Sequence, residues 1–168
     1  MNHISQGEFF VSARASDHVS TVLGSCVAAC LWDPVLHVGG MNHILMPDGT
    51  SFASDSRLYG INAMEILINE IGKQGGVKAR LKAKLFGGAS MIDGLGDVGK
   101  RNAEFALEFL RVEGISCEAQ SLGGAQARRI QFWPSRGRAR QKLLDRTVQL
   151  PEGKFAPRAL PPIDIEIF

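Results

Sequence analysis

The chain has 168 residues, with 19 basic and 17 acidic side chains and a formal net charge of +2. This balance is close to neutral, so the bulk charge gives no indication of a general polyanion binder. Hydrophobic residues make up 45% of the chain and charged residues 21%, which excludes a disordered protein and is typical of one globular domain with its own core.

The cysteine content and the amino-terminal segment bear on the cellular compartment. Three cysteines, Cys26, Cys30 and Cys117, do not suggest a disulfide framework in a chain of this length. The first ten residues lack the charged and apolar regions of a secretory signal, and the apolar run 27–32 is far shorter than the roughly 20 residues of a bilayer span. We therefore expect a cytoplasmic protein with reduced thiols.

The hydrophobic pattern alternates between the strand period and the helix period. Apolar residues at spacings of three and four predict helices over 57–72 and 98–112, with Ser56 as the N-cap of the first. Asp33 and Pro34 predict a turn, and the runs on either side of it predict a hairpin. The predicted strands are 8–11, 19–23, 27–32, 38–45, 77–85, 115–119, 128–133 and 139–150.

This order of elements predicts a single-domain α/β fold: a layered α/β sandwich with a mixed or antiparallel sheet and two main helices. We place the domain at residues 1–150. The segment 151–168 has four prolines followed by an Ile-Asp-Ile-Glu-Ile pattern, which predicts a Pro-rich C-terminal arm or an edge strand.

Cys26 and His43 form the constellation most capable of chemistry. A thiol becomes an effective nucleophile when a nearby imidazole takes its proton, and strands paired in a hairpin can bring two such side chains together. This pairing would lower the pKa of Cys26. Ser20 and Thr21 are the nearby hydroxyls that could hold the imidazole in one tautomer.

Two other interpretations of these residues stay open. A cysteine in an apolar run is most often a small buried hydrophobe, which fits Cys30 and Cys117. Cys26, Cys30, His37 and His43 also carry the ligand types that zinc prefers. However, a strand rises about 3.3 Å per residue, which would place Cys26 and Cys30 roughly 13 Å apart, so we expect no metal.

Several short motifs together resemble the chemoreceptor glutamine deamidase family, CheD. The resemblance covers most of the chain, from about residue 7 to 130, and the LGSC and MNH blocks are its specific part. The motifs are LGSCV at 23–27, Asp33-Pro34, GGMNH at 39–43 with Pro47 after it, GGAS at 87–90, and Gly123-Gly124 with Ala127-Arg128.

The resemblance implies a cysteine amidohydrolase that converts glutamine side chains of methyl-accepting chemotaxis receptors to glutamate, with release of ammonia and without a cofactor. It places the nucleophile at Cys26 and the histidine at His43. The family's third residue is commonly a threonine six positions before the cysteine, where this chain has Ser20. Strand alternation also favours Ser20, because positions 20 and 26 share parity, while Thr21 is the alternative.

The resemblance further implies two kinds of partner: the cytoplasmic helices of the receptors and a CheC-type phosphatase. The alternative function is therefore a non-catalytic chemotaxis interaction protein that binds such a phosphatase, although the presence of both Cys26 and His43 argues against it. Basic residues at 78–84 and 128–142 are typical of a solvated face, or of a surface that docks on acidic receptor helices. We expect neither a nucleic-acid partner nor insertion into a membrane.

Overall fold

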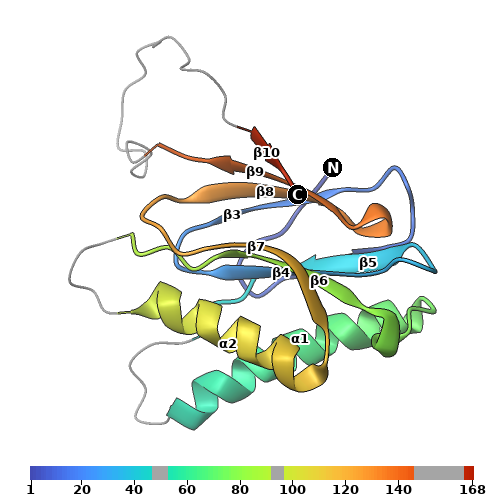
Figure 1. Ribbon diagram of the computed structural model, residues 1–168, viewed down its shortest axis with the longest axis horizontal. Helices are drawn as coiled ribbons and strands as arrows, with labels where there is room; N and C mark the ends of the chain where they lie inside the picture. Colours follow the sequence, from blue (N-terminus) through green and yellow to red (C-terminus); the bar gives the residue numbers. More distant parts are fainter. Residues whose placement is uncertain (47–52, 92–96, 146–164) are drawn as a thin grey trace.

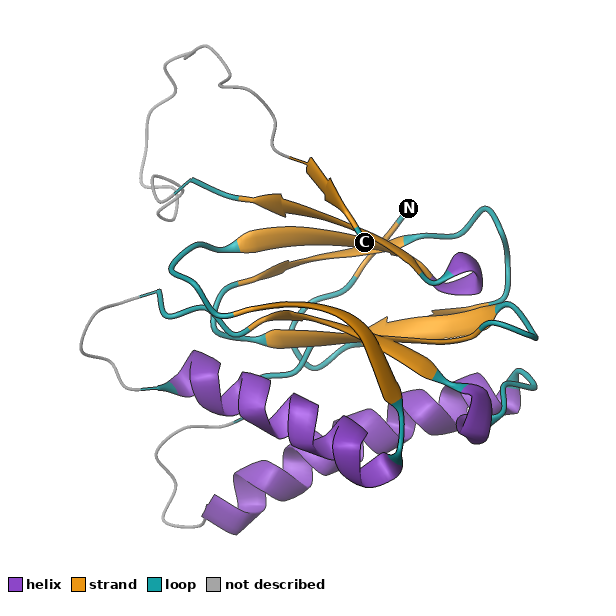
Figure 2. Ribbon diagram, in the orientation of Figure 1, coloured by secondary structure: helices purple, strands orange, loops and turns teal. Residues whose placement is uncertain are grey.

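The computed structural model of the chain describes residues 1–46, 53–91, 97–145 and 165–168. These described residues form two five-stranded sheets and a pair of helices, arranged in three layers (Figure 1). Both helices cover one face of one sheet, called sheet B. The other sheet, called sheet A, packs on the opposite face of sheet B (Figure 2). Within the described ranges, no helix combines the length and the apolarity that a bilayer span demands.

Each sheet combines strands from distant parts of the chain. Sheet A has the order β1-β3-β8-β9-β10, and sheet B has the order β2-β5-β4-β6-β7. Neighbouring strands are antiparallel except β1–β3 and β6–β7. The elements are β1 (Asn2–His3), β2 (Phe9–Ser12), β3 (Val19–Leu23), β4 (Val27–Asp33), β5 (Val38–Asn42), α1 (Ala53–Lys73), η1 (Lys78–Arg80), β6 (Lys82–Gly87), α2 (Val98–Glu113), β7 (Ser116–Leu122), β8 (Arg128–Trp133), η2 (Pro134–Arg136), β9 (Arg138–Leu143) and β10 (Ile165–Ile167).

β4 is the middle strand of sheet B and is buried on both faces, which explains its uninterrupted apolar sequence. Its side chains alternate between two cores. Val27, Ala29 and Leu31 pack in the core that includes both helices, whereas Ala28, Cys30 and Trp32 pack in the core between the sheets.

The predicted single-domain layered α/β fold is confirmed, with two stacked sheets where one was expected. The hairpin around Asp33 and Pro34 is confirmed as the β4–β5 pair. The prediction of Ser56 as an N-cap is wrong, because α1 already begins at Ala53. β9 ends at Leu143, and β10 pairs with it as an edge strand; residues 146–164, which include most of the predicted arm, lie outside the described residues.

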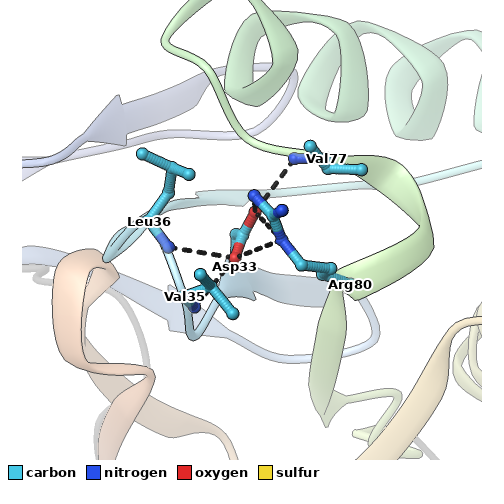
Figure 3. Close-up of polar contacts among 5 residues, drawn as sticks. All are labelled: Asp33, Val35, Leu36, Val77 and Arg80. Atoms are coloured by element: carbon cyan, nitrogen blue, oxygen red, sulfur yellow. Dashed lines mark hydrogen bonds and ion pairs between the residues drawn. The ribbon is translucent and has the colours of Figure 1, made fainter.

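The predicted strand 77–85 is wrong in its first half. Lys78–Arg80 form a 3₁₀ turn, and the strand begins only at Lys82. The 3₁₀ turn forms in place of a strand because the buried carboxylate of Asp33 binds Val77 and Arg80, at the two ends of this turn. The carboxylate accepts the Val77 N–H at 3.0 Å and binds the Arg80 guanidinium, with 2.7 Å between Nη2 and Oδ2 (Figure 3).

The same carboxylate also closes the turn after β4. Asp33 Oδ1 accepts the amides of Val35 and Leu36 at 2.9 and 3.1 Å, which is the local bonding that makes Asp a turn residue. The hydrogen bonds from Arg80 and from the three amides hold the pKa of Asp33 far below its usual range, although burial opposes them. One side chain therefore joins the β4–β5 turn to the connection between α1 and β6.

Candidate active site

Cys26 lies where the chain crosses from sheet A to sheet B, between the end of β3 and the start of β4. It packs against the core between the sheets and is half-buried. A glycine-rich segment after β6 holds the crossing from one side: Gly88 N–H donates to Cys26 O at 2.8 Å, and Ala89 N–H donates to Gly24 O at 2.9 Å.

Gly87 is required in this segment for two independent reasons. Its φ of +112° disfavours any residue with a side chain, and a Cβ here would collide with the Cys26 carbonyl oxygen. The GGAS motif thus brings its backbone close enough to fix the cysteine loop.

Arg128 supports the far side of the glycine-rich segment. The outward-facing arginines of the β8–β9 hairpin are exposed or partly exposed, but Arg128 points between the sheets and is only 3% exposed. Its guanidinium donates to the carbonyls of Ser121 and Gly123, and Gly123 N–H in turn donates to Gly87 O. The predicted basic stretch is therefore split between the surface and the site.

His43 lies on the same face of sheet B as Cys26. Val27 and Ile44 exchange two backbone hydrogen bonds, which extends the β4–β5 register beyond Asn42 and sets His43 opposite Ala28. Cys26 is then the diagonal neighbour of His43, at a typical Cα separation of about 7–8 Å. Among the described residues, no hydrogen bond joins the thiol to the imidazole, and the buried His43 Nε2 has no partner.

Thr21 provides the hydroxyl beside His43. Thr21 Oγ1 lies 2.8 Å from His43 Nδ1 and donates its own proton to the Ile4 carbonyl at 2.7 Å. Because a hydroxyl has a single proton, Thr21 accepts from His43, so Nδ1 carries the hydrogen. This hydrogen bonding leaves the Nε2 lone pair free to act as a base.

Ser20 faces the other side of β3 and does not contact His43. Its hydroxyl lies 3.3 Å from His3 Nδ1, on the neighbouring strand β1. Parity between positions 20 and 26 favoured Ser20, but strand alternation does not carry across the turn at 24–26, where the chain changes sheets. The signal within β3 itself is the pattern Val19-x-Thr21-x-Leu23, whose three residues face the inter-sheet core.

Burial determines the ionisation of both groups. Desolvation lowers the pKa of His43, with a smaller effect of the same sign from His3, so the imidazole is neutral at physiological pH. Desolvation also raises the pKa of the Cys26 thiol, outweighing the opposite effect of its own backbone N–H. The expected lowering of the Cys26 pKa is therefore wrong for the free protein, because the thiol is half-buried and has no bond to the imidazole.

We expect alkylation of Cys26 by iodoacetamide to keep accelerating as the pH rises to the ordinary thiol pKa of 9.0 and beyond, because the thiolate forms only there. Cys30, which is fully buried, should stay unlabelled until the protein unfolds. Peptide mass spectrometry of samples labelled over a pH series measures both. A Cys26 rate that levels off near neutral pH would instead reveal a preformed thiolate–imidazolium pair.

The other two cysteines differ from each other. Cys30 is buried in β4, as predicted, whereas Cys117 is exposed on β7, an edge strand of sheet B, contrary to the prediction that both are core residues. Among the described residues, no three His, Cys, Asp or Glu side chains gather in a way that could hold a metal ion.

Asn102 is a site residue that the sequence analysis missed. It lies on α2, is 2% exposed, and bonds to backbone groups on either side of the site: Ser25 O and Met46 N. The available signal was a single asparagine one residue before Ala103 and four before Ala106, at the edge of an otherwise apolar helix face.

Comparison with known proteins identifies the family. A family model described as "CheD chemotactic sensory transduction" matches residues 45–143. The chain belongs to the CheD family. The resemblance carried by the LGSC and MNH motifs is therefore confirmed, although the matched range begins just after His43.

Two CheD relatives cover most of the chain. A protein of Caulobacter vibrioides (strain NA1000 / CB15N) is 52% identical over 84% of this chain and 77% of its own length. A protein of Rhizobium etli (strain CIAT 652) is 48% identical over 99% of this chain and 95% of its own length. Both are named "Probable chemoreceptor glutamine deamidase CheD".

Among solved structures, the Bacillus licheniformis hypothetical protein YfiH superposes with a TM-score of 0.44 at 12% identity. The match covers 67% of this CheD chain and 49% of the other chain. A similarity this low carries no argument about the site.

Proposed function

We propose that this CheD-family protein is a cysteine-dependent hydrolase that deamidates glutamine side chains of chemoreceptors. The observation that carries the proposal is the shared face of sheet B, where Cys26 is the diagonal neighbour of a buried His43. The Nδ1–H of that histidine is held by Thr21 and its Nε2 is open. This arrangement supplies a nucleophile, a base and a group that orients the base.

The reaction is an acyl transfer in two halves. His43 Nε2 takes the thiol proton as Cys26 Sγ attacks the carboxamide carbon, and the resulting tetrahedral oxyanion then collapses to a thioester. The imidazolium gives its proton to the departing ammonia. Neutral His43 next removes a proton from water, which attacks the thioester and releases glutamate and the thiol.

Thr21 and the Ile4 carbonyl lie on the Nδ1 side of His43, opposite the nitrogen that acts as the base. The Ile4 carbonyl raises the pKa of His43, against the larger lowering by burial, because it stabilises the charged form. Thr21 keeps the proton on Nδ1, so that Nε2 is the basic nitrogen in every cycle. We therefore propose Thr21, in place of Ser20, as the third residue of the site.

The oxyanion needs hydrogen-bond donors that are not already in use. Among the described residues, the backbone amides of Ser25 and Cys26 donate to no other residue, whereas the carbonyls of Gly24, Ser25 and Cys26 are all hydrogen-bonded. The carbonyl oxygens of this loop are thus engaged in hydrogen bonds, while the amides of Ser25 and Cys26 are available to bind an oxyanion.

The function is tested by incubating the purified protein with a cytoplasmic fragment of a chemoreceptor and analysing its peptides by mass spectrometry. We expect selected glutamines to gain the mass that accompanies replacement of an amide NH₂ by OH, with ammonia released in equal amount. Unchanged glutamines in fragments from several receptors of the same cell would overturn the proposal.

We also propose a cytoplasmic location, because the cytoplasmic part of the receptors is the substrate in this proposal. Binding of a CheC-type phosphatase stays a prediction.

We expect Thr21→Val to lower kcat about 10- to 100-fold, because the isosteric side chain removes the acceptor that fixes the imidazole. Thr21→Ser should recover most of the activity, since it keeps the hydroxyl. The matched control is Ser20→Ala on the same strand, which should stay within about threefold of the wild type. Single-turnover deamidation measures all three, and a crippled Ser20→Ala beside an active Thr21→Val would return the role to Ser20.

A further inference from the structure

Asn102 makes two hydrogen bonds of opposite polarity to two different parts of the site. Its Nδ2 donates to Ser25 O at 2.8 Å, and its Oδ1 accepts from Met46 N at 3.1 Å. The pairing determines the orientation of the side-chain amide, because the reversed amide would face an acceptor with an acceptor and a donor with a donor. Asn102 is 2% exposed, so neither bond competes with bulk water.

The bond to Ser25 also sets the direction of the next backbone amide. The Ser25–Cys26 peptide is trans, so its C=O and N–H point in opposite directions. A Ser25 carbonyl held against α2 therefore aims the Cys26 N–H away from the helix. This N–H and the thiol belong to the same residue, so the amide is within reach of an oxyanion that forms on a carbon bonded to the sulfur.

The position of α2 relative to the cysteine loop is itself fixed by close backbone packing, so Asn102 can set the direction of the Cys26 N–H. Gly99, in its first turn, packs directly on the backbone of Gly88 and Ala89, where a Cβ would collide with both carbonyl oxygens. Gly88 and Ala89 in turn bind the carbonyls of Cys26 and Gly24. The cysteine loop is thus fixed from two sides, by the glycine-rich backbone and by the Asn102 side chain.

The second bond of Asn102 extends the alignment to the base. Met46 follows His43 by three residues, and the intervening Ile44 is paired with Val27, the residue after Cys26. One buried amide therefore spans the loop that carries the nucleophile and the segment that carries the base.

We propose that Asn102 is a positioning residue for deamidation, which aims the Cys26 N–H as an oxyanion donor and keeps the loop of Cys26 in register with the segment after His43. The role rests on the proposed function. It acts on the tetrahedral intermediate and on the transition states that lead to and from it, because the oxyanion forms only there, and hardly at all on binding of the intact glutamine.

The first test is Asn102→Ala, with Glu104→Ala on the exposed face of the same helix as the matched control. We expect Asn102→Ala to lower kcat about 10- to 100-fold with little change in KM, and Glu104→Ala to match the wild type. The rate of Cys26 alkylation, which needs no oxyanion hole, should stay within about twofold of the wild type. A kcat near that of the wild type, or a change in KM alone, would overturn the role.

The second test is Asn102→Asp, read as a pH profile so that one folded variant serves as its own control. The ionised carboxylate repels the Ser25 carbonyl, whereas the protonated acid can donate to it and still accept from Met46 N–H. We expect the kcat of Asn102→Asp, relative to wild type at the same pH, to rise as the pH falls. A ratio independent of pH would overturn the role even if Asn102→Ala failed to fold.

The two proposals fail in different ways. If the wild-type protein deamidates no receptor fragment, the proposed function fails, and the role of Asn102 fails with it. If the wild type is active and both Asn102 variants keep their activity and their pH profile, only the role of Asn102 is overturned.

Discussion

Cys26→Ala should abolish deamidation, with a loss on the order of 10⁴–10⁶-fold in kcat, because no other group can form the thioester. His43 and the two free amides would remain, but they stabilise a transition state that the variant cannot reach. The measurement is the same mass analysis of receptor peptides, carried to times at which the wild type has converted every susceptible glutamine.

The fold should survive the substitution, since Cys26 is half-buried and only one sulfur atom is removed from the edge of the core. Cys117→Ala is the matched control, because Cys117 is exposed and far along the chain in β7, and it should keep full activity. Full activity in Cys26→Ala would end the mechanism. Activity lost equally in both variants would show that the assay responds to general damage to the protein.

Asp33→Ala should lower the free energy of unfolding by about 3–5 kcal/mol, because it leaves a guanidinium and three amides without their common acceptor. Asp33 is fully buried, while the Arg80 side chain is 35% exposed, so Arg80→Ala should cost less than Asp33→Ala. Urea denaturation at neutral pH measures both. The control is Glu108→Ala, which breaks an exposed pair with Arg111 and should leave the midpoint unchanged.

The contribution of Asp33 should also depend on pH in a defined direction. Its pKa is depressed in the folded state, so its stabilisation is complete above the unfolded pKa of about 4 and is lost as the pH falls below that value. Wild type and Asp33→Asn should therefore approach each other in stability in acid. If wild type and Asp33→Asn differ in stability by the same amount above and below the unfolded pKa, the ion pair is not the cause of the difference.

The motif residues and most strands could be predicted from the sequence, because their signals are local. The run Val27–Asp33 is apolar on both faces, and its structure is a strand buried on both faces. Asp33 indicated a turn, and its Oδ1 makes the expected bonds to Val35 and Leu36. The residues at which two strands meet, Cys26 and His43, were placed on one hairpin by the same local reasoning.

The local sequence thus specifies the set of chemical groups and the strands and turns that bear them. Which of these groups come into contact depends on the packing of the two sheets and the helices. Thr21 contacts His43 because β3 belongs to a different sheet from β4, and a period of two cannot be carried through a turn that changes sheets. Asp33 Oδ2 reaches Val77 and Arg80, and Asn102 reaches Ser25, across separations of more than 40 residues. Such contacts leave no periodic trace in the sequence, because they depend on how the layers pack and not on the conformation of any one segment.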